Sequence, residues 1–421
     1  MAGTSGAKLN ENRRSLRLTG PILVGLVVVR ILVVVIGIAR TSTVPVTDDY
    51  VIRFHEIATS EGRPYRDFPV EYAPGELIGI ELVGGGSLEA TVAGLLILNL
   101  VADLTTAWLV ARGWGRRAGA WYLLLGTPLL WFSYLGFDLV SVLFTVAGIL
   151  LARGGRERSG GILIAAAVWT RLWPVLLVPA LWVSGRRRSA WWALGATVGL
   201  VMLWVAYGGL AGLRQVATFR GAQGWEFESL IGAVWWIVEG SAGAVSTAGA
   251  SRFGVAPWWA KGILAVLALA GVTLVWRKAR HDPTAVARPG LAAIAVLLCC
   301  SPLLSYPFVV WMLPWAAVAG EEGGDGPRMR ALAGVAMLLT AAAVATFGMK
   351  EQAAWLTQSL LVARNLVIVG VAGLWLLGRR ANEPPSEGGG SFEPDGTGTP
   401  YDSRSSGLRK PSSQEGGDSP S

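Results

Sequence analysis

Long apolar stretches, separated by short segments that are often rich in arginine, make up the sequence from residue 21 to residue 380. A helix needs about 20 mostly apolar residues to cross the hydrocarbon core of a bilayer. The stretches of this kind are 21–39, 92–111, 118–134, 137–152, 160–183, 190–209, 260–276, 290–319, 331–347 and 355–377. The pattern predicts an all-α polytopic membrane protein, a bundle of about twelve membrane helices if two of the stretches are broken.

Two of these stretches, 160–183 and 290–319, have basic residues on both sides. Basic clusters favour the cytoplasmic side, but about 24 residues are too few to cross a membrane twice. We therefore expect 160–183 to form two short helices that meet at Thr170 and Arg171, just before Pro174, with a similar break at the SPLLSYP segment of 290–319. Broken helices line cavities in membrane proteins. The alternative for 160–183 is one ordinary span with an imperfect charge bias.

The distribution of basic residues also predicts on which side of the membrane each polar segment lies. Clusters before the first span and at the ends of later spans put both termini in the cytoplasm, so that the polar segments 40–75 and 210–258 lie outside. Residues 1–20 are expected to form a cytoplasmic tail and residues 21–380 the membrane domain. Residues 381–421, rich in Gly, Ser, Pro and acidic side chains, are expected to be a disordered cytoplasmic tail. We expect a multi-pass protein of the cytoplasmic (plasma) membrane.

The composition excludes several classes of protein. Of the 421 residues, 52% are hydrophobic and 15% are charged, whereas a soluble domain is about 25% charged. An ordinary soluble enzyme and a disordered protein are therefore excluded. The net charge is +8, but no basic face with interleaved aromatic residues is present, so no nucleic-acid partner is expected. Cys299 and Cys300 are adjacent and offer neither a disulfide framework nor metal-ligand spacing.

The first external segment carries more charge than a connection between helices requires. Its carboxylates are Asp48, Asp49, Glu56, Glu61, Asp67, Glu71 and Glu76, and its basic side chains include Arg53, His55, Arg63 and Arg66. Asp48 and Asp49 follow the first span closely and would lie at the level of lipid head groups. Adjacent like charges raise one pKa, which favours a general base; alternatively, one of the two caps a helix near 50–60. The arginines suggest an anionic ligand, with a weak charge bias as the alternative.

Ionisable residues within apolar stretches are costly unless they are paired or functional. Arg30 in the first span and Asp103 in the second are expected to form an ion pair that holds these helices together. Asp138, at the outer end of its span, either reaches a site or caps a helix at the interface. The stretch 160–183 contains Arg171 but no Asp or Glu. The partner of Arg171 must therefore be a carboxylate of another helix, such as Asp103 or Asp138, or else water or an anionic ligand. An extended side chain that reaches the interface is the alternative.

Four sequence blocks carry a resemblance to a known family. They are GRPYRDFPVEYAPG (62–75), TRLWPVLLVPALWVSGRRR (170–188), FRGAQGWEFESL (219–230) and SYPFVVWMLPWAA (305–317). In this order they resemble glycosyltransferase family 87, polytopic enzymes of the GT-C type that use polyprenyl-phosphate sugars. The resemblance extends over residues 45–320, most of the membrane domain. The chain departs from the family at Ala73, where a proline is usual, at Arg171, where a lysine is usual, and in the loosely matching segment 305–308.

The resemblance implies an inverting glycosyltransferase that moves a sugar, mannose by analogy, from a polyprenyl-phosphate donor to a lipid-linked or cell-envelope glycan acceptor outside the membrane. Asp49, or Asp48 if the alignment shifts by one residue, would be the base that takes the proton of the acceptor hydroxyl. Arg171 and Arg220 would bind the donor phosphate, which leaves as a stable anion and needs cations rather than an acid. Candidate substrate-binding residues are His55, Tyr65, Arg66, Glu71, Tyr72, Asp138 and Glu228.

No DxD, HExxH or Cys/His motif stands apart from these blocks, so neither a metal nor another cofactor is expected, with the Asp48–Asp49 pair as the alternative metal site. Two other classes of function remain. A lipid or glycan transporter (flippase) would also use broken helices and buried charges, although no internal repeat is evident between the two halves. A non-catalytic subunit of an envelope-synthesis complex would tolerate the loss of Asp48 and Asp49. The carboxylates of the first external segment favour the enzyme.

Overall fold

The computed structural model describes residues 20–41, 43–46, 48–218, 223–239, 244–247, 250–347 and 354–378. These residues belong to one compact unit. Arg220 and nearly all of the two expected tails, 1–20 and 381–421, lie outside the described residues. The division of the chain into tails and a membrane domain therefore stays a prediction.

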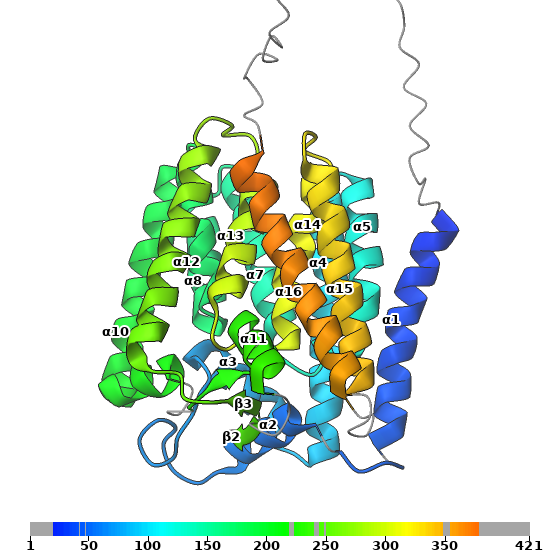
Figure 1. Cartoon of the computed structure of the whole chain (residues 1–421), viewed down its shortest axis with the longest axis vertical. Helices are drawn as coiled ribbons and strands as arrows, with labels where there is room; N and C mark the ends of the chain where they lie inside the picture. Colours follow the sequence, from blue (N-terminus) through cyan, green and yellow to red (C-terminus); the bar gives the residue numbers. More distant parts are fainter. Residues whose placement is uncertain are drawn as a thin grey trace, which may run out of the picture. The chain divides into compact units, whose positions relative to one another are not determined.

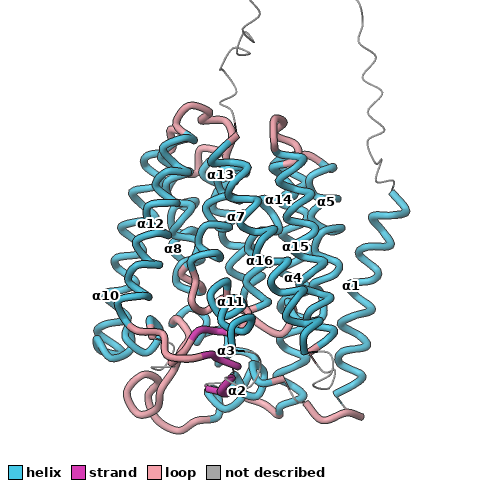
Figure 2. Tube along the Cα trace, in the orientation of Figure 1, coloured by secondary structure: helices cyan, strands magenta, loops and turns pink. Residues whose placement is uncertain are grey.

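Helices form most of the described chain (Figures 1 and 2). The α-helices are α1 (Gly20–Thr41), α2 (Asp49–Thr59), α3 (Pro74–Gly84), α4 (Leu88–Trp114), α5 (Arg116–Gly126), α6 (Leu130–Ser133), α7 (Asp138–Arg153), α8 (Glu157–Thr170), α9 (Val178–Val183), α10 (Arg187–Ala217), α11 (Leu230–Glu239), α12 (Trp258–Ala279), α13 (Ala287–Cys300), α14 (Leu313–Ala319), α15 (Gly326–Thr346) and α16 (Ala354–Leu377). The 3-10 helices are η1 (Thr127–Leu129), η2 (Trp173–Leu177) and η4 (Tyr306–Met312). The strands β1 (Trp225–Glu226), β2 (Ala244–Thr247) and β3 (Ala250–Phe253) form a small antiparallel sheet in the order β1-β3-β2, an addition to the expected all-α fold.

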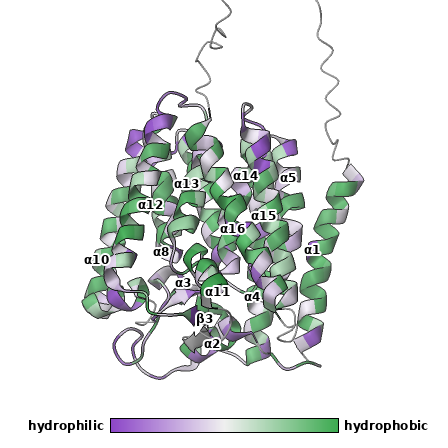
Figure 3. Ribbon diagram, in the orientation of Figure 1, coloured by the Kyte–Doolittle hydropathy of each residue, from purple (hydrophilic) through white to green (hydrophobic). Residues whose placement is uncertain are grey.

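Six of the described helices, α1, α4, α10, α12, α15 and α16, are long and apolar enough to cross a membrane. Their apolar character is visible along the bundle in Figure 3. Large apolar side chains on α10 and α12 are exposed, for example Leu210 (73%) and Leu269 (69%), which is unfavourable in water but not in lipid. The chain is thus a predominantly helical membrane protein, as the sequence predicts. A count of about twelve membrane helices stays a prediction, because the remaining helices are shorter than one crossing.

The segment 157–183 turns back on itself near its midpoint. Helix α8 ends at Thr170, and Arg171 takes an extended conformation (φ −142°, ψ 133°) before η2 and α9 follow. Pro174 lies in the first turn of η2, where its missing N–H costs little. At the far end, the Arg186 guanidinium donates a hydrogen bond to the carbonyl oxygen of Arg153 (3.1 Å). The basic clusters that flank this segment therefore lie side by side.

The second predicted break, in 290–319, follows a similar path. Ser301, which follows α13, is extended (φ −77°, ψ 125°), as expected for a residue before proline, and η4 and α14 lead the chain back. Just beyond α14, the Glu322 carboxylate accepts three hydrogen bonds from backbone N–H groups at the start of α13, at 2.8, 2.9 and 2.9 Å. The start of α13 and the end of α14 are thereby tied together.

Helices α2, α3 and α11 and the small sheet gather at the end of the bundle away from these ties (Figure 1). Tyr65 anchors the loop before α3, although its positive φ (70°) is unfavourable for a residue with a side chain. Its hydroxyl donates to the carbonyl oxygen of Tyr72 (2.7 Å), and its ring packs on Trp204 of α10. Gln215, also of α10, donates to the Tyr65 carbonyl oxygen (3.0 Å) and accepts from the N–H of Val70 (2.9 Å). This outer loop is therefore fixed to the bundle.

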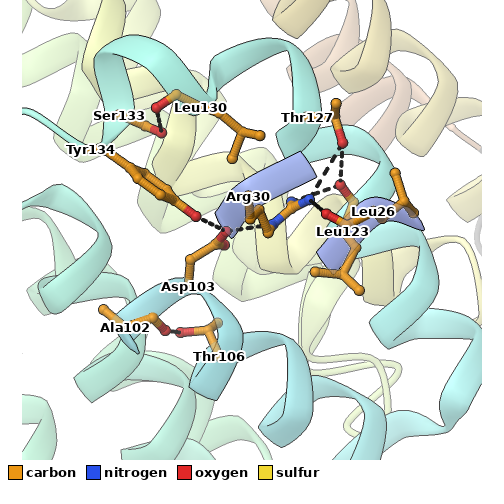
Figure 4. A network of polar contacts seen from close by, with 10 residues as sticks. All are labelled: Leu26, Arg30, Ala102, Asp103, Thr106, Leu123, Thr127, Leu130, Ser133 and Tyr134. Atoms are coloured by element: carbon orange, nitrogen blue, oxygen red, sulfur yellow. Dashed lines mark hydrogen bonds and ion pairs between the residues drawn. The ribbon is translucent and has the colours of Figure 1, made fainter. Parts of the chain in front are cut away.

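A buried ion pair joins the first two long helices (Figure 4). The Arg30 guanidinium of α1 lies 2.7 Å from the Asp103 carboxylate of α4, and the two side chains are 0% and 2% exposed. Tyr134 donates its hydroxyl hydrogen to the same carboxylate (2.8 Å), and Arg30 also donates to the carbonyl oxygen of Leu123 (2.8 Å). The ion pair predicted from the sequence is confirmed, and it extends to α5 and the segment after α6.

Replacement of Arg30 by methionine should strongly destabilise the protein. The variant leaves the Asp103 carboxylate buried without its cation, a loss that costs roughly 3–5 kcal/mol in buried pairs. The thermal midpoint of unfolding in detergent should fall markedly, and the double variant Arg30→Met/Asp103→Leu should recover most of the loss. The control is Arg112→Met, which removes an exposed arginine of α4. An unchanged midpoint in Arg30→Met would contradict the role of the pair.

Candidate functional site

A cavity of about 980 Å³, here called the large cavity, lies where the outer helices meet the two breaks in the bundle. Its walls come from α2, the start of α3, the start of α7, the segments that follow α8 and α13, β1 and η4. Its lining includes the side chains of Asp49, Glu76, Asp138, Arg171, Glu226 and Trp311. Acidic, basic and aromatic groups therefore face one space beside apolar helices.

Asp48 and Asp49 have different environments although they are adjacent. The Asp48 carboxylate caps α2, because it accepts hydrogen bonds from the N–H groups of Tyr50 and Val51, both at 3.1 Å. Burial raises the pKa of Asp48, while these two hydrogen bonds lower it and Asp49 adds a small increase. Asp49 is the first residue of α2, is exposed and lines the large cavity. Its carboxylate has no hydrogen-bond or ion-pair partner among the described residues, and it faces the cavity.

Arg171, at the break after α8, is held between two carboxylates. Its guanidinium lies 2.9 Å from Glu76 of α3 and 3.1 Å from Asp138 of α7, and only 16% of its side chain is exposed. Of the two partners considered from the sequence, Asp138 is the one it contacts, while Asp103 is paired with Arg30. The ion pairs therefore connect the outer helix α3 to the break in the bundle.

Glu76 holds its proton more tightly than an ordinary glutamate. Burial raises the pKa of its carboxyl to about 8; Arg171 opposes this increase, while Asp138 and Glu71 add to it. At neutral pH Glu76 is therefore mostly neutral, while the Asp138 carboxylate lies 3.1 Å from the Arg171 guanidinium. The cluster as a whole carries little net charge, which suits its position beside apolar helices.

A glycine allows α3 to approach this cluster. A Cβ atom at Gly75 would lie 2.7 Å from the carbonyl carbon and oxygen of Trp169 and 2.8 Å from the backbone nitrogen of Thr170. Such distances are far below van der Waals contact, so only glycine lets the start of α3 lie directly against the end of α8. Glu76, the next residue, is brought to Arg171 by this close approach.

Three stacked aromatic rings form another wall of the large cavity. The Trp311 ring stacks on Trp173 (5.5 Å between centroids, 15° between planes) and on Phe308 (4.5 Å, 16°). The Trp311 indole N–H donates to the Asp138 carboxylate (2.7 Å), which fixes the orientation of the ring. Such a flat apolar surface beside hydrogen-bonding groups suits a sugar ring or an isoprenoid chain.

The second outer segment reaches the large cavity through Glu226. Burial and the nearby Glu228 raise the pKa of Glu226 to about 8, and Arg252 and Arg364 oppose the increase. Glu228 itself pairs with Arg364 of α16 (3.1 Å), and the Asn365 amide donates to the Glu228 carbonyl oxygen (3.1 Å). These contacts attach β1 to a membrane helix and so hold Glu226 at the cavity.

The residues predicted from the sequence divide into two groups. The side chains that line the large cavity are Asp48, Asp49, Glu71, Tyr72, Asp138 and Arg171. Those that do not line it are His55, Tyr65, Arg66 and Glu228. His55 contacts the carbonyl oxygen of Gly84 (3.2 Å), and Arg66 donates to that of Ala206 (3.1 Å). In the described chain, the residues that do not line the cavity instead hold the segments around 55–66 and 225–228 against neighbouring helices.

Several residues of the site were not predicted from the sequence. Glu76, Glu226 and Trp311 were not among the predicted site residues, because nothing in the sequence shows which side chains face a common space. The importance of Arg364 and Asn365 could have been predicted from the sequence, because both are polar residues in the middle of the apolar stretch 355–377, where such residues need a partner. The signal is the same one that identified Arg30 and Asp103.

Among the described residues, no group of three or more His, Cys, Asp or Glu side chains is arranged to hold a metal ion. No protein-family model matches the chain, and no curated protein matches it either. The fold and the site therefore define a class: a helical membrane protein with a polar, aromatic-walled cavity at one end of its bundle.

The raised pKa of Glu76 predicts a dependence of stability on pH. Between its ordinary pKa of 4.5 and the folded value of about 8, the unfolded chain loses a proton that the folded chain keeps. The free energy of unfolding therefore decreases as the pH rises through this window, and outside the window the contribution of Glu76 no longer changes with pH. Glu76→Gln, which is neutral throughout, should gain thermal stability relative to the wild type between about pH 5 and pH 8.

The measurement is the difference in thermal midpoint between variant and wild type at each pH, in detergent. Glu81→Gln, which changes an exposed carboxylate of the same helix, is the control and should show a nearly constant difference. A constant difference for Glu76→Gln as well would mean that Glu76 ionises normally in the folded protein.

Proposed function

We propose that the chain is an integral-membrane inverting glycosyltransferase that transfers a sugar, mannose by analogy, from a polyprenyl-phosphate donor. The acceptor would be a lipid-linked or cell-envelope glycan on the outer face of the cytoplasmic membrane. One observation carries the proposal: the Asp49 carboxylate, which has no hydrogen-bond or ion-pair partner among the described residues, lines the same cavity of about 980 Å³ as the largely buried Arg171 and a stacked aromatic wall. These are the groups that such a reaction needs, and they lie beside helices that are long and apolar enough to cross a membrane.

The chemistry assigns a role to each group. Asp49 accepts the proton of the acceptor hydroxyl as that oxygen attacks the anomeric carbon of the sugar. The bond between this carbon and the donor phosphate breaks, and the polyprenyl phosphate leaves as an anion. No proton donor is required for this leaving group, but a cation stabilises the charge that develops on it. Arg171 is the candidate cation that the described chain presents to the large cavity beside the aromatic wall.

The ion pairs of Arg171 are compatible with this role. Glu76 is mostly neutral at pH 7, so it can give up its position beside Arg171 at a lower cost than an ionised carboxylate. A donor phosphate then takes that place, while Asp138 keeps the guanidinium oriented from the other side (3.1 Å). Arg171 would thus exchange one partner on donor binding.

The four sequence blocks support assignment to glycosyltransferase family 87, which we propose as a distant relationship. Each block contributes to the large cavity, although the blocks are far apart in the sequence. The contributing side chains are, in block order, Glu71 and Tyr72, Arg171 and Trp173, Glu226, and Tyr306 and Trp311. Convergence on one cavity is expected of blocks that share a function, and is not expected of chance matches.

The distribution of charge supports an orientation with the large cavity facing outward. The basic clusters near Arg153 and Arg186 lie together, and Lys278 at the end of α12 donates to carbonyl oxygens at the end of α16. These sites lie at the end of the bundle away from α2 and α3 (Figure 1). Basic residues favour the cytoplasmic side. We therefore propose that both termini are cytoplasmic and that 157–183 and 287–319 enter the membrane and return.

The proposed topology can be tested with single cysteines in a background that lacks Cys299 and Cys300. Ser60→Cys should react with a membrane-impermeant thiol reagent in intact cells, because residue 60 is exposed in the outer segment. Arg187→Cys, also exposed, should react only after the membrane is permeabilised. Labelling of position 187 from outside would make 157–183 a single crossing and would overturn the returning path.

The proposed reaction can be tested by transfer of labelled mannose from polyprenyl-phosphate mannose in membranes that contain the protein. Asp49→Asn should lower turnover by about 10²–10⁴-fold, the usual contribution of a general base, with little change in donor affinity. Asp48→Asn should have a smaller effect, because asparagine also caps helices. The control is Glu61→Gln, which alters an exposed carboxylate of the same loop outside the large cavity.

Near-normal turnover in Asp49→Asn would show that the base is assigned wrongly. Movement of labelled lipid across the membrane without sugar transfer would favour the flippase. The absence of both activities would favour a non-catalytic subunit of an envelope-synthesis complex.

A further inference from the structure

A second, smaller cavity of about 320 Å³ lies beside the outer end of α1. We call it the α1 groove, and its walls come from the end of α1, residues 44–46, Asp48, Val51 of α2, the first half of α4, and α6 with the residues that follow it. Its apolar lining includes Val44, Val92, Leu96, Trp131 and Leu135. Gly37 allows the close packing of α1 on α4, because a Cβ atom there would lie 2.7 Å from the Leu96 side chain.

Arg40 provides the positive charge of the α1 groove. Its guanidinium carbon lies 5.8 Å from the centre of the Trp131 ring, within the range of a cation–π contact. No carboxylate of the described chain forms an ion pair with Arg40, and Asp48, which also lines the groove, is engaged in capping α2. By contrast, Arg30 and Arg171 are both paired with carboxylates. Arg40 is therefore positioned to receive an external anion.

The surroundings of Arg40 indicate that this anion is attached to an apolar chain. Arg40 lies in the last turn of α1, a helix long and apolar enough to cross a membrane, and so at the depth of lipid phosphates. The rim of the groove is apolar and exposed, with Val44 45% and Trp131 48% accessible. Figure 1 shows α1 at the edge of the bundle, where lipid can reach it. A lipid phosphate matches both the charge and the apolar rim.

The α1 groove adjoins the large cavity. Asp48 and Leu135 line both spaces, and Asp49 follows directly in the large cavity. A head group whose phosphate lies at Arg40 can therefore extend past Asp48 towards Asp49. The donor, by the proposed function, occupies the large cavity with its phosphate at Arg171. The α1 groove then has the position required for a second substrate.

We infer that the α1 groove binds a lipid-linked acceptor, with the lipid phosphate on Arg40, the lipid chain along α1 and α4, and the acceptor hydroxyl directed to Asp49. This inference rests on the proposed function, and of the two acceptors considered it selects the lipid-linked one over a cell-envelope glycan. The bond that forms and the proton that moves are those described above. Arg40 is a binding residue and takes no part in proton transfer.

The test is photolabelling of the purified full-length protein in lipid vesicles. The probe is a photoreactive polyprenyl phosphate, and labelled peptides are mapped by mass spectrometry. Labelling of peptides that contain 37–46 and 131–135 should fall by about five- to tenfold in Arg40→Gln, the size expected from loss of one cationic contact to a lipid phosphate. The matched control is Arg112→Gln, which removes another arginine that lies over an exposed tryptophan, Trp108 (5.6 Å), from α4.

Two further probes complete the test. A photoreactive polyprenol of the same chain length that lacks the phosphate should label wild type and Arg40→Gln equally weakly. Free inorganic phosphate should compete poorly with the polyprenyl phosphate probe for labelling. Equal labelling of wild type and Arg40→Gln by the phosphate probe, or an equal loss in Arg112→Gln, would overturn the inference, because the contact would then be that of any surrounding lipid.

Photolabelling does not depend on turnover, so the inference and the proposed function can fail separately. If sugar transfer occurs, Arg40→Gln should raise the KM for a lipid-linked acceptor several-fold and leave the KM for the donor unchanged. Transfer without any effect of Arg40→Gln on labelling would overturn the α1 groove alone. Labelling that depends on Arg40 in a protein without transferase activity would overturn the proposed function and leave a lipid-phosphate site.

Discussion

Charged side chains inside an apolar helix bundle must find partners there, because an unpaired charge in a low-dielectric interior costs several kcal/mol, and three arginines of this protein satisfy that requirement. Arg30 joins α1 to α4 through Asp103, Arg171 joins the break after α8 to α3 and α7, and Arg364 joins α16 to the segment that carries β1. Each pair links elements that are distant in the sequence. The positions of the outer segments, and therefore the shape of the large cavity, depend on these contacts.

The same requirement draws attention to the charged side chains that have no partner among the described residues. Most buried carboxylates and guanidinium groups near the site already have partners within the described chain, which accounts for their presence without any ligand. Asp49 and Arg40 have none among the described residues; Asp49 lines the large cavity, Arg40 lines the α1 groove, and Asp48 lines both. By the proposed function, Asp49 would deprotonate the hydroxyl of an acceptor lipid whose phosphate is bound at Arg40. The stacked Trp173, Trp311 and Phe308 rings would then serve the donor.

The sequence and the structure agree most closely where one physical rule dominates. Apolar length located the six long helices, with ends that differ by up to eight residues, as at the end of α10. Helix α8 ends at Thr170, whereas a broken hairpin within the membrane stays a prediction. Arg30 and Asp103 could be paired in advance, because each was an isolated charge in a long apolar span. Arg364 is likewise an isolated charge in a long apolar span, but its ion pair was not predicted. The sequence could not show that Asp48 rather than Asp49 caps α2, since the two aspartates have the same local propensity.

The sequence by itself determined that this is a helical membrane protein, which stretches form its long helices, and that charged side chains are concentrated in the segment 43–76, because these properties follow from apolar length and local charge. Only the tertiary structure decided which side chains share a cavity. Glu76 reaches Arg171 because Gly75 lets α3 lie against α8, and Glu226 reaches the same space because Arg364 holds its neighbour Glu228. Such contacts depend on the packing of helices that are far apart in the chain, and no periodicity or motif within one helix encodes them.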